Sequence, residues 1–326
     1  VSEAVLRHWD IGTTDISKAF LQGVTYKELH EMTGEPLREV SFDLPAYCIP
    51  FLKKIPGYED FDPTKEVLHC DKPGTGCVDA PRCFSLKLAK VTQELCGMKP
   101  CLVDNEMCLL HKRQSSEDGI AGGCATPGKL IAMMTKHVDD LKVTGDRETV
   151  IWILKQIEKV FGQMKIEWNN FTNCGVRHQQ DINTKEISLD QIDYIKGIKT
   201  IVHSDLQREK PDTLCTPEVH QLYWSILGAI AFAILTRPDI AVFVGALQRF
   251  NQKPHIIHAK RLNAVVRWAQ RNPKRLFYCS LDGSGRPQGT LFKSFEKKGI
   301  TVHPAGVVGA VHESSIHALE NSLLRT

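Results

Sequence analysis

Two adjacent aspartates, Asp139 and Asp140, lie between two apolar segments that both have the composition of β-strands. Residues 130–134 (LIAMM) precede the pair, and residues 141–144 (LKVT) follow it. Apolar runs on either side of a short polar break predict two strands that meet at the aspartates. Because adjacent like charges repel and are poorly suited to strand interiors, the pair needs a reason to be held there.

The residues alone leave two interpretations of the pair open. Aspartate is common in β-turns, because its side chain can hydrogen-bond to the backbone two residues further on. Alternatively, hard cations such as Mg²⁺ bind one or two carboxylates and leave room for substrate phosphates. The cation interpretation needs a third carboxylate, for which Asp15 is the candidate, although its position is equally typical of a helix N-cap.

Helical and strand-like segments follow one another irregularly in the rest of the chain. Residues 85–97 and 148–162 have apolar residues at helical spacing, and each predicts an amphipathic helix whose apolar side lies in the core. Residues 185–198 predict a strand followed by a short helix. Strands mixed with helices outside a regular βαβ repeat predict an α+β architecture. With 326 residues the chain is long enough for two or three compact units, and residues 205–217 are the candidate linker.

The composition is that of an ordinary globular protein, with 42% apolar and 24% charged residues. The longest apolar stretch, residues 224–235, is too short to span a bilayer and predicts a buried helix, so no membrane partner is expected. The eleven cysteines have neither zinc-site spacing nor a disulfide pattern. The first residue is valine and no secretory signal follows, which indicates a piece of a longer intracellular protein, in a cytoplasmic particle or the nucleus. No feature indicates an oligomeric state.

The net charge of +3 is unevenly distributed along the chain. Residues 247–298 contain twelve Lys and Arg but only two acidic residues, so this stretch carries +10 and the remainder −7. Within it, residues 255–272 lie between two prolines and predict one helix. Its apolar residues fall on one face, and Lys260, Arg267 and Arg271 fall on the opposite face. The basic face is either a solvated surface or a contact surface for nucleic-acid phosphates.

Six segments, taken in order, resemble motifs of the reverse transcriptases of Ty1/copia-type retrotransposons. Residues 13–23 (TTDISKAFLQG) resemble that family's first aspartate motif, and residues 136–145 (KHVDDLKVTG) resemble its Asp-Asp hairpin. The other four segments are residues 55–60 (IPGYED), 76–84 (GCVDAPRCF), 187–198 (ISLDQIDYIKGI) and 223–270. The last of these contains the sequence Thr-Arg-Pro-Asp. The resemblance extends over roughly residues 8–278.

The resemblance implies a polymerase palm, in which an antiparallel sheet is backed by helices, followed by a helical thumb-like or connection unit. It divides the chain into three parts. Residues 1–204 are the palm with part of the fingers, residues 205–278 the thumb- or connection-like region, and residues 279–326 a truncated or degenerate start of a ribonuclease H-like region.

The resemblance also implies an RNA-directed DNA polymerase that uses two Mg²⁺ (or Mn²⁺) ions for nucleotidyl transfer. Asp15, Asp139 and Asp140 match the family's three catalytic, metal-binding carboxylates. Because neighbouring strand residues point to opposite faces, Asp139 is expected to bridge both ions with Asp15, and Asp140 to be peripheral. The implied partners are an RNA or DNA template with its primer, and deoxynucleoside triphosphates.

Five further residues are expected near the nucleotide or the template. Gly76 would let the backbone approach the nucleotide, and Arg82 would meet a template phosphate or lie at the surface. His137 would keep a planar ring near the primer end. The remaining two are Phe20 of the first motif and Pro81, which precedes Arg82 at the start of a helix.

The chain departs from the family pattern at several places, which keeps two other functions open. His137 and Thr75 stand where aromatic residues are usual, and only fourteen residues precede Asp15, so the basic residues of the upstream fingers are expected to be absent. One alternative is a catalytically dead nucleic-acid-binding remnant that uses the basic helix face. The other is an unrelated metal-dependent phosphoryl-transfer enzyme, which predicts no proximity of Asp15 to Asp139.

Overall fold

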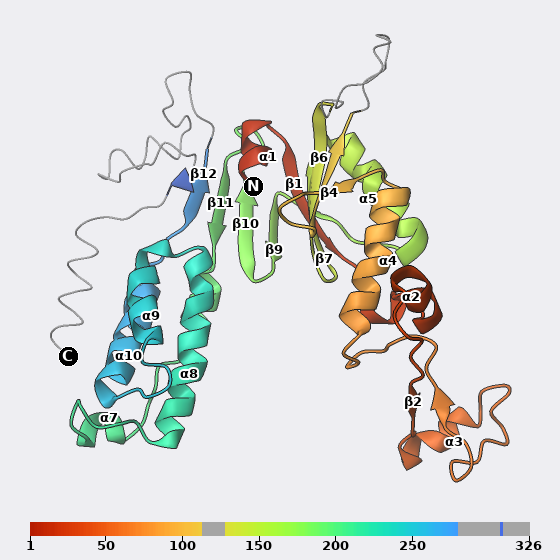
Figure 1. The fold of residues 1–326 in the computed structure, drawn as a ribbon. Coiled ribbons are helices and arrows are strands. Elements are labelled where there is room, and N and C mark those ends of the chain that lie inside the picture. The colour runs from red at the N-terminus through yellow and green to blue at the C-terminus, as the bar shows by residue number, and fades with distance from the viewer. Residues whose placement is uncertain (113–127, 280–306, 309–326) are drawn as a thin grey trace. The chain divides into compact units, whose positions relative to one another are not determined.

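The computed structural model describes residues 1–112, 128–279 and 307–308 (Figure 1). By its internal packing the chain divides into two compact units. Unit 1 consists of residues 1–13, 144–147 and 167–326, and unit 2 of residues 14–143 and 148–166. The division therefore falls inside strands β1 (Asp10–Asp15) and β7 (Asp140–Gly145), whereas the motif resemblance places boundaries at residues 204 and 278.

Unit 2 is built on a sheet in which β4, β5, β6, β7 and the end of β1 lie side by side in that order. The first three strands are β4 (Lys99–Pro100), β5 (Met107–His111) and β6 (Leu130–His137). The pairs β4–β5 and β5–β6 are antiparallel, and β6 and β7 form the predicted hairpin. Burial alternates along β6 and β7, as the period of two in their side-chain directions requires.

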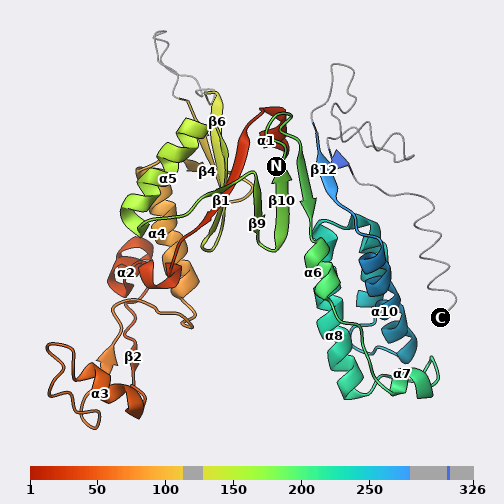
Figure 2. The ribbon, with the colours of Figure 1, turned by 180° about the vertical axis from the view of Figure 1, so that it is seen from behind.

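Two long helices of unit 2 cover one face of this sheet (Figures 1 and 2). They are α4 (Ala80–Glu94) and α5 (Arg147–Phe161), close to the predicted ranges. The rings of Phe84 and Phe161 meet edge to face with centroids 5.7 Å apart, and the Cys96 thiol donates to the Ile153 carbonyl. The apolar stripes predicted from the sequence are therefore buried, and they bring the two helices into contact with each other.

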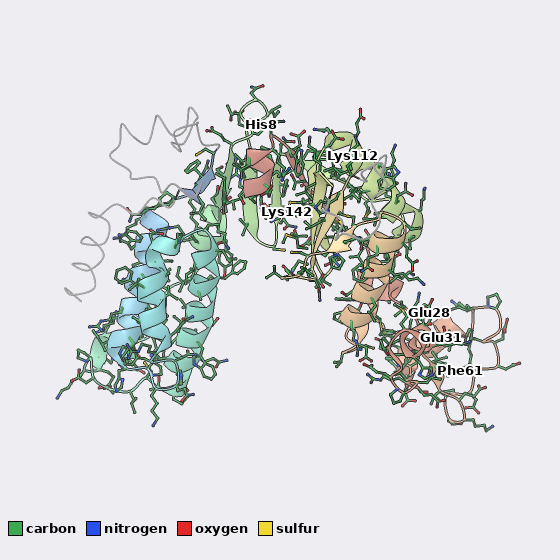
Figure 3. All side chains as sticks on the ribbon, turned by 45° about the horizontal axis from the view of Figure 1, so that its top comes forward. His8, Glu28, Glu31, Phe61, Lys112 and Lys142 are labelled. Atoms are coloured by element: carbon green, nitrogen blue, oxygen red, sulfur yellow. The ribbon has the colours of Figure 1, made fainter. Side chains whose placement is uncertain are left out.

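The segment between β1 and α4 has little regular structure. It contains η1 (Ala19–Gln22), α2 (Tyr26–Thr33), the two-stranded sheet of β2 (Ser41–Phe42) and β3 (Leu68–His69), and the short helices η2 (Ala46–Cys48) and α3 (Ile49–Leu52). Helix α2 begins with a capping box, in which Thr25 and Glu28 satisfy each other's backbone N–H groups. Glu28 and Glu31 both lie on α2 and line a groove against α4 (Figure 3).

Unit 1 contains a five-stranded sheet with the order β13-β12-β11-β10-β9, and all its pairings are antiparallel. Its strands are β9 (Asn170–Asn173), β10 (Val176–Gln180), β11 (Ile187–Asp190), β12 (Leu276–Tyr278) and β13 (Val307–Val308). The β9–β10 turn has positive φ at Cys174 and Gly175, as two-residue hairpin turns prefer. The start of β1 pairs with β8 (Glu167–Trp168), and α1 (Ser2–Leu6) packs on the sheet core.

The helical part of unit 1 has its own apolar core. It consists of α6 (Ile192–Gly197), α7 (Asp205–Arg208), α8 (Pro217–Phe232), η3 (Ala233–Leu235), η4 (Pro238–Ile240), α9 (Ala241–Gln248) and α10 (Ile256–Arg271). The candidate linker at residues 205–217 belongs to this part, because it contains α7 and Leu214 bridges to His255. Of the degenerate region expected at 279–326, only Cys279 and β13 lie within the described residues.

Helix α8 differs from its sequence interpretation in length and in exposure. With η3 it forms one apolar helix of 19 residues, Pro217–Leu235, which by length and composition is long enough to cross a membrane. The helix begins at Pro217, so it is longer than the apolar stretch at residues 224–235 on which the sequence argument rested. Only 33% of its most apolar window is buried, so the helix is buried on one side only. A core helix of a globular domain passes the same test, which makes the feature weak evidence for a membrane.

Candidate functional site

The end of β1 lies beside the tip of the β6–β7 hairpin in unit 2. The Ile16 N–H donates a hydrogen bond of 3.1 Å to the Asp139 carbonyl. This bond joins Asp15, the last residue of β1, to the hairpin turn through its immediate neighbour. The sequence could not show this proximity, because it depends on β1 and β7 being adjacent in the sheet.

The turn of the hairpin contains a strained residue immediately before the aspartates. Val138 and Asp139 connect β6 to β7, and Val138 has a φ of 57°. Left-handed backbone is unfavourable for a β-branched residue, and strain of this kind costs about 1–3 kcal/mol. In turns selected for stability, Gly, Asn or Asp occupies that position. Here valine occupies it, so the strained position of this turn is not filled by a residue that favours it.

The three carboxylates differ in exposure. Asp15 and Asp139 are exposed, and Asp140, the first residue of β7, is half-buried. Within the described residues no group of three or more His, Cys, Asp or Glu is positioned to hold a metal ion. Carboxylate oxygens are nevertheless the ligands that Mg²⁺ and Mn²⁺ prefer. Since like charges repel, the three groups would draw together only around a cation, and their donor chemistry fits a hard divalent ion.

Lys136 is a residue near the hairpin tip that the sequence interpretation missed. It is on the inward face of β6, and its side chain is only 3% exposed. Its ammonium lies 3.6 Å from the Glu106 carboxylate, and its backbone N–H donates to the Glu106 carbonyl. The burial of Lys136 could have been predicted from the sequence. Ala132, Met134 and Lys136 occupy alternate positions of the strand and therefore share its inward face.

The glycine of the Ala-Phe-Leu-x-Gly segment has a packing role. A Cβ at Gly23 would lie 3.0 Å from the Phe84 nitrogen and 3.0 Å from the Cys83 Cβ. The Val24 N–H donates to the Cys83 carbonyl, and the Gln22 side chain donates to the Phe161 carbonyl. These interactions fix the segment after Asp15 against α4 and α5. Phe20 lies in η1 and is half-buried.

The remaining predicted nucleotide-binding residues lie on other elements. Arg82 is exposed on α4 and donates to both carboxylate oxygens of Glu35, at 2.9 and 2.6 Å. Hydrogen bonding from Arg82 holds the pKa of the Glu35 carboxyl below its ordinary value. Gly76 has a φ of 95° with open space around it, so its backbone conformation explains the glycine in this structure. Pro81 is in the first turn of α4, and His137 is exposed at the end of β6.

The basic residues of α10 lie as the sequence predicts. Arg267 and Arg271 are exposed, Lys260 is half-buried, and the opposite side of the helix is packed in the core. Within the part of the chain that the structure describes, none of the three forms an ion pair. By contrast, Lys274 and Arg275, just after the helix, face Asp239 at 3.4 Å and Asp190 at 3.2 Å. The α10 face therefore offers three cations to a partner.

A second polar cluster, which the sequence interpretation did not identify, is centred on Asp10 in unit 1. Its carboxylate accepts hydrogen bonds from Lys185 at 2.6 Å, Arg147 at 3.1 Å and Asn169 at 3.1 Å. Burial raises the pKa of the Asp10 carboxyl, but the three donors outweigh it and hold the pKa below its ordinary value. Because the carboxylate already accepts from all three donors, the role of this cluster is structural.

Comparison with known proteins gives a distant relationship. A retrovirus-related Pol polyprotein from transposon RE1 of Arabidopsis thaliana is 21% identical over 283 residues, covering 83% of this chain. The chain is similar to part of a retrotransposon Pol polyprotein. The matched region is 16% of that polyprotein's length. No family model matches the chain, and no solved structure matches it. The similarity supports an origin of this chain in a retrotransposon Pol polyprotein.

Proposed function

We propose that this chain is the reverse transcriptase part of a copia-type Pol polyprotein, an RNA-directed DNA polymerase. The observation that supports this most directly is the hydrogen bond from Ile16 to Asp139, which joins the end of β1 to the Asp-Asp hairpin. An unrelated phosphoryl-transfer enzyme that shares only the Asp pair would not require this proximity. The similarity to a Pol polyprotein supports the same conclusion.

In this proposal Asp15, at the end of β1, and Asp139, in the β6–β7 turn, hold Mg²⁺ or Mn²⁺, and Asp140 contributes from a half-buried position. When bound, the ions would activate a primer hydroxyl and stabilise the charge of a nucleoside triphosphate. The residues of the chain position these groups. The strained turn at Val138 presents the Asp139 carboxylate to solvent, and the packing of Gly23 fixes the segment after Asp15. The substrates are a primed RNA or DNA template and deoxynucleoside triphosphates.

The residues that would bind the nucleotide and the template belong to the same proposal. His137 lies one residue before the turn, where its exposed ring can face a primer end. Arg82 can bind a template phosphate only if it leaves Glu35, and an exposed ion pair of this kind contributes little to stability. The cations Lys260, Arg267 and Arg271 would bind backbone phosphates at the thumb-like unit.

The test is Mg²⁺-dependent extension of a primed template by this chain, alone and within its parent polyprotein. Asp139→Asn removes the charge but keeps the shape, and it should abolish extension. Folding should be unchanged or slightly more stable, because repulsion with Asp140 is relieved. Asp43→Asn, at an exposed aspartate in the segment before α4 and outside the six motif segments, is the matched control and should extend normally. Normal extension by the Asp139 variant would contradict the proposal.

A second candidate is a nucleic-acid-binding remnant without polymerase activity. It is favoured by one contrast in this structure. The three aspartates do not form a ligand group among the described residues, whereas the three basic side chains of α10 form no ion pair among those residues and can bind phosphates. This candidate predicts that the wild-type chain binds a primed template but does not extend it at any Mg²⁺ or Mn²⁺ concentration, alone or within the polyprotein.

A further inference from the structure

Two exposed aromatic side chains lie at the loop between α9 and α10 in unit 1. Trp224 of α8 is 53% exposed, and Phe250, just after α9, is 41% exposed. The Trp224 indole N–H donates a hydrogen bond of 2.7 Å to the carbonyl of Asn251, the residue after Phe250. The two rings therefore flank the same short stretch of backbone. Large exposed aromatic residues on a well-packed helical unit indicate a binding surface.

Both rings are held in place by other side chains. The His220 ring lies edge-on to Trp224 with centroids 5.0 Å apart, and its Nε2 is 2.7 Å from the same Asn251 carbonyl. Phe250 stacks on His258 with a centroid distance of 3.8 Å. The loop backbone is closed by hydrogen bonds from Phe250 to Leu247 and from Lys253 to Phe250. Rings fixed in this way lose little conformational entropy when a partner stacks on them.

The loop that contains Phe250 and accepts the Trp224 hydrogen bond is basic. Residues 248–254 (QRFNQKP) contain Arg249 and Lys253 and no acidic residue. Both side chains are exposed, and neither forms an ion pair within the residues that the structure describes. Unit 2 offers an informative contrast. Its exposed aromatic residues Tyr47 and Phe51 lie in residues 35–79, where nine acidic residues oppose five Lys and Arg.

We propose that Trp224, Phe250, Arg249 and Lys253 form a binding surface for single-stranded nucleic acid. Every base has a flat face that can stack on an aromatic ring, and cations beside the rings neutralise the phosphates that link the bases. The fixed ring of Trp224 on α8, together with Phe250 and the two basic side chains of the adjoining loop, supplies both requirements. This inference rests on the proposed function and adds the strand state of the ligand, since duplex bases are already stacked on one another and cannot use the rings.

The experiment measures binding of a fluorescent single-stranded oligonucleotide and of a blunt duplex of the same length. Trp224→Ala and Phe250→Ala should each weaken single-strand binding about tenfold, within the range measured for base–aromatic stacking. Both should leave duplex binding unchanged. Trp152→Ala is the matched control, because Trp152 is 45% exposed but lies on α5 of unit 2. It should bind the single strand as the wild type does.

A further pair of variants separates the rings from the charges. Trp224→Phe keeps a stacking ring and should restore most of the affinity that Trp224→Ala loses, which excludes a folding defect as the cause. Arg249→Ala with Lys253→Ala should flatten the slope of log affinity against log salt by about 0.7 for each phosphate that is no longer neutralised, whereas the ring variants should not.

Two outcomes would overturn the inference. One is wild-type single-strand affinity in both ring-to-alanine variants. The other is displacement of the oligonucleotide by an acidic peptide, together with ring variants that lose as much affinity for the duplex as for the single strand. That result would indicate a surface for anions in general. Neither outcome bears on the polymerase proposal, because primer extension and the Asp139→Asn variant test that separately.

Discussion

The guanidinium of Arg237 is completely buried and holds the carboxylate of Asp239 through two hydrogen bonds of 2.8 and 3.0 Å. A third donor nitrogen bonds to the Ala269 carbonyl near the end of α10, at 3.1 Å. Beside it, the Thr236 hydroxyl donates to the Gln191 side chain at 3.1 Å. Through these hydrogen bonds the Thr-Arg-Pro-Asp segment, which precedes α9, contacts the end of α10 and Gln191, the residue after β11. Its role in this structure is structural.

Removing one member of this buried pair should strongly destabilise unit 1. Arg237→Leu leaves the buried Asp239 with Lys274 as a more distant partner, and breaking a buried pair costs about 3–5 kcal/mol. Arg237→Lys should also be destabilising, because an ammonium cannot replace the two-pronged bond and the Ala269 hydrogen bond together. Chemical denaturation followed by circular dichroism measures both. A loss of stability below about 1 kcal/mol in the leucine variant would contradict this structural role.

The start of α10 should be sensitive to pH. The His255 N–H donates to the His258 Nδ1 at 3.0 Å, and the His255 side chain caps the helix in return. The bond requires His258 to be neutral at Nδ1. Burial, and then the neighbouring His255 and Arg261, lower the pKa of His258 from its ordinary value of 6.5. The folded state therefore disfavours the proton.

The sign of the pH effect follows from linkage. Because the folded-state pKa lies below the unfolded value, the unfolded chain binds more protons at this site. The stability that the cap provides is therefore complete above about pH 6.5 and declines as the pH falls towards the folded pKa. His258→Asn keeps an acceptor but does not titrate, so its free energy of unfolding should change less between about pH 7 and 5 than that of the wild type. His8→Asn, at an exposed histidine, is the control and should keep the wild-type dependence.

A prediction for unit 2 concerns the close approach of Gly23 to α4. An alanine there would place its Cβ 3.0 Å from the Phe84 nitrogen, which is backbone and cannot move without shifting the helix. Gly23→Ala should destabilise the protein by about 1–3 kcal/mol. Gly74→Ala is the matched control, because its nearest neighbour would be the flexible Leu21 side chain at 3.8 Å. If the two variants had equal thermal stability, α4 would be able to shift at little cost in the free energy of unfolding.

These interactions show which parts of the molecule the sequence could predict. Periodicity identified α4, α5 and α10 and the β6–β7 hairpin, because each is encoded in neighbouring residues. Periodicity could not show that β1 lies beside β7, since strand order depends on interactions between distant segments. Nor could it show the positive φ of Val138, because composition alone predicts a turn residue there. The palm architecture and the metal-binding roles of the aspartates remain predictions from the resemblance.

The last prediction concerns the basic face of α10. If Lys260, Arg267 and Arg271 bind phosphates, replacing all three by alanine should weaken binding to a primed template whatever its sequence. The slope of log affinity against log salt should flatten by about 0.9 for each duplex phosphate that is no longer neutralised, because fewer counterions are released. The packed side of the helix is untouched, so the free energy of unfolding should change by less than about 0.5 kcal/mol for each substitution.

The control for this prediction replaces three exposed lysines of unit 2, Lys27, Lys72 and Lys155, which removes the same net charge. A general effect of charge would flatten the slope equally in both triple variants. A specific phosphate track on α10 requires the larger change in the α10 variant. An unchanged slope there would mean that the face is solvated, as basic helix faces commonly are. The nucleic-acid-binding remnant would then lose its principal support, whereas the polymerase proposal would still depend on Asp139.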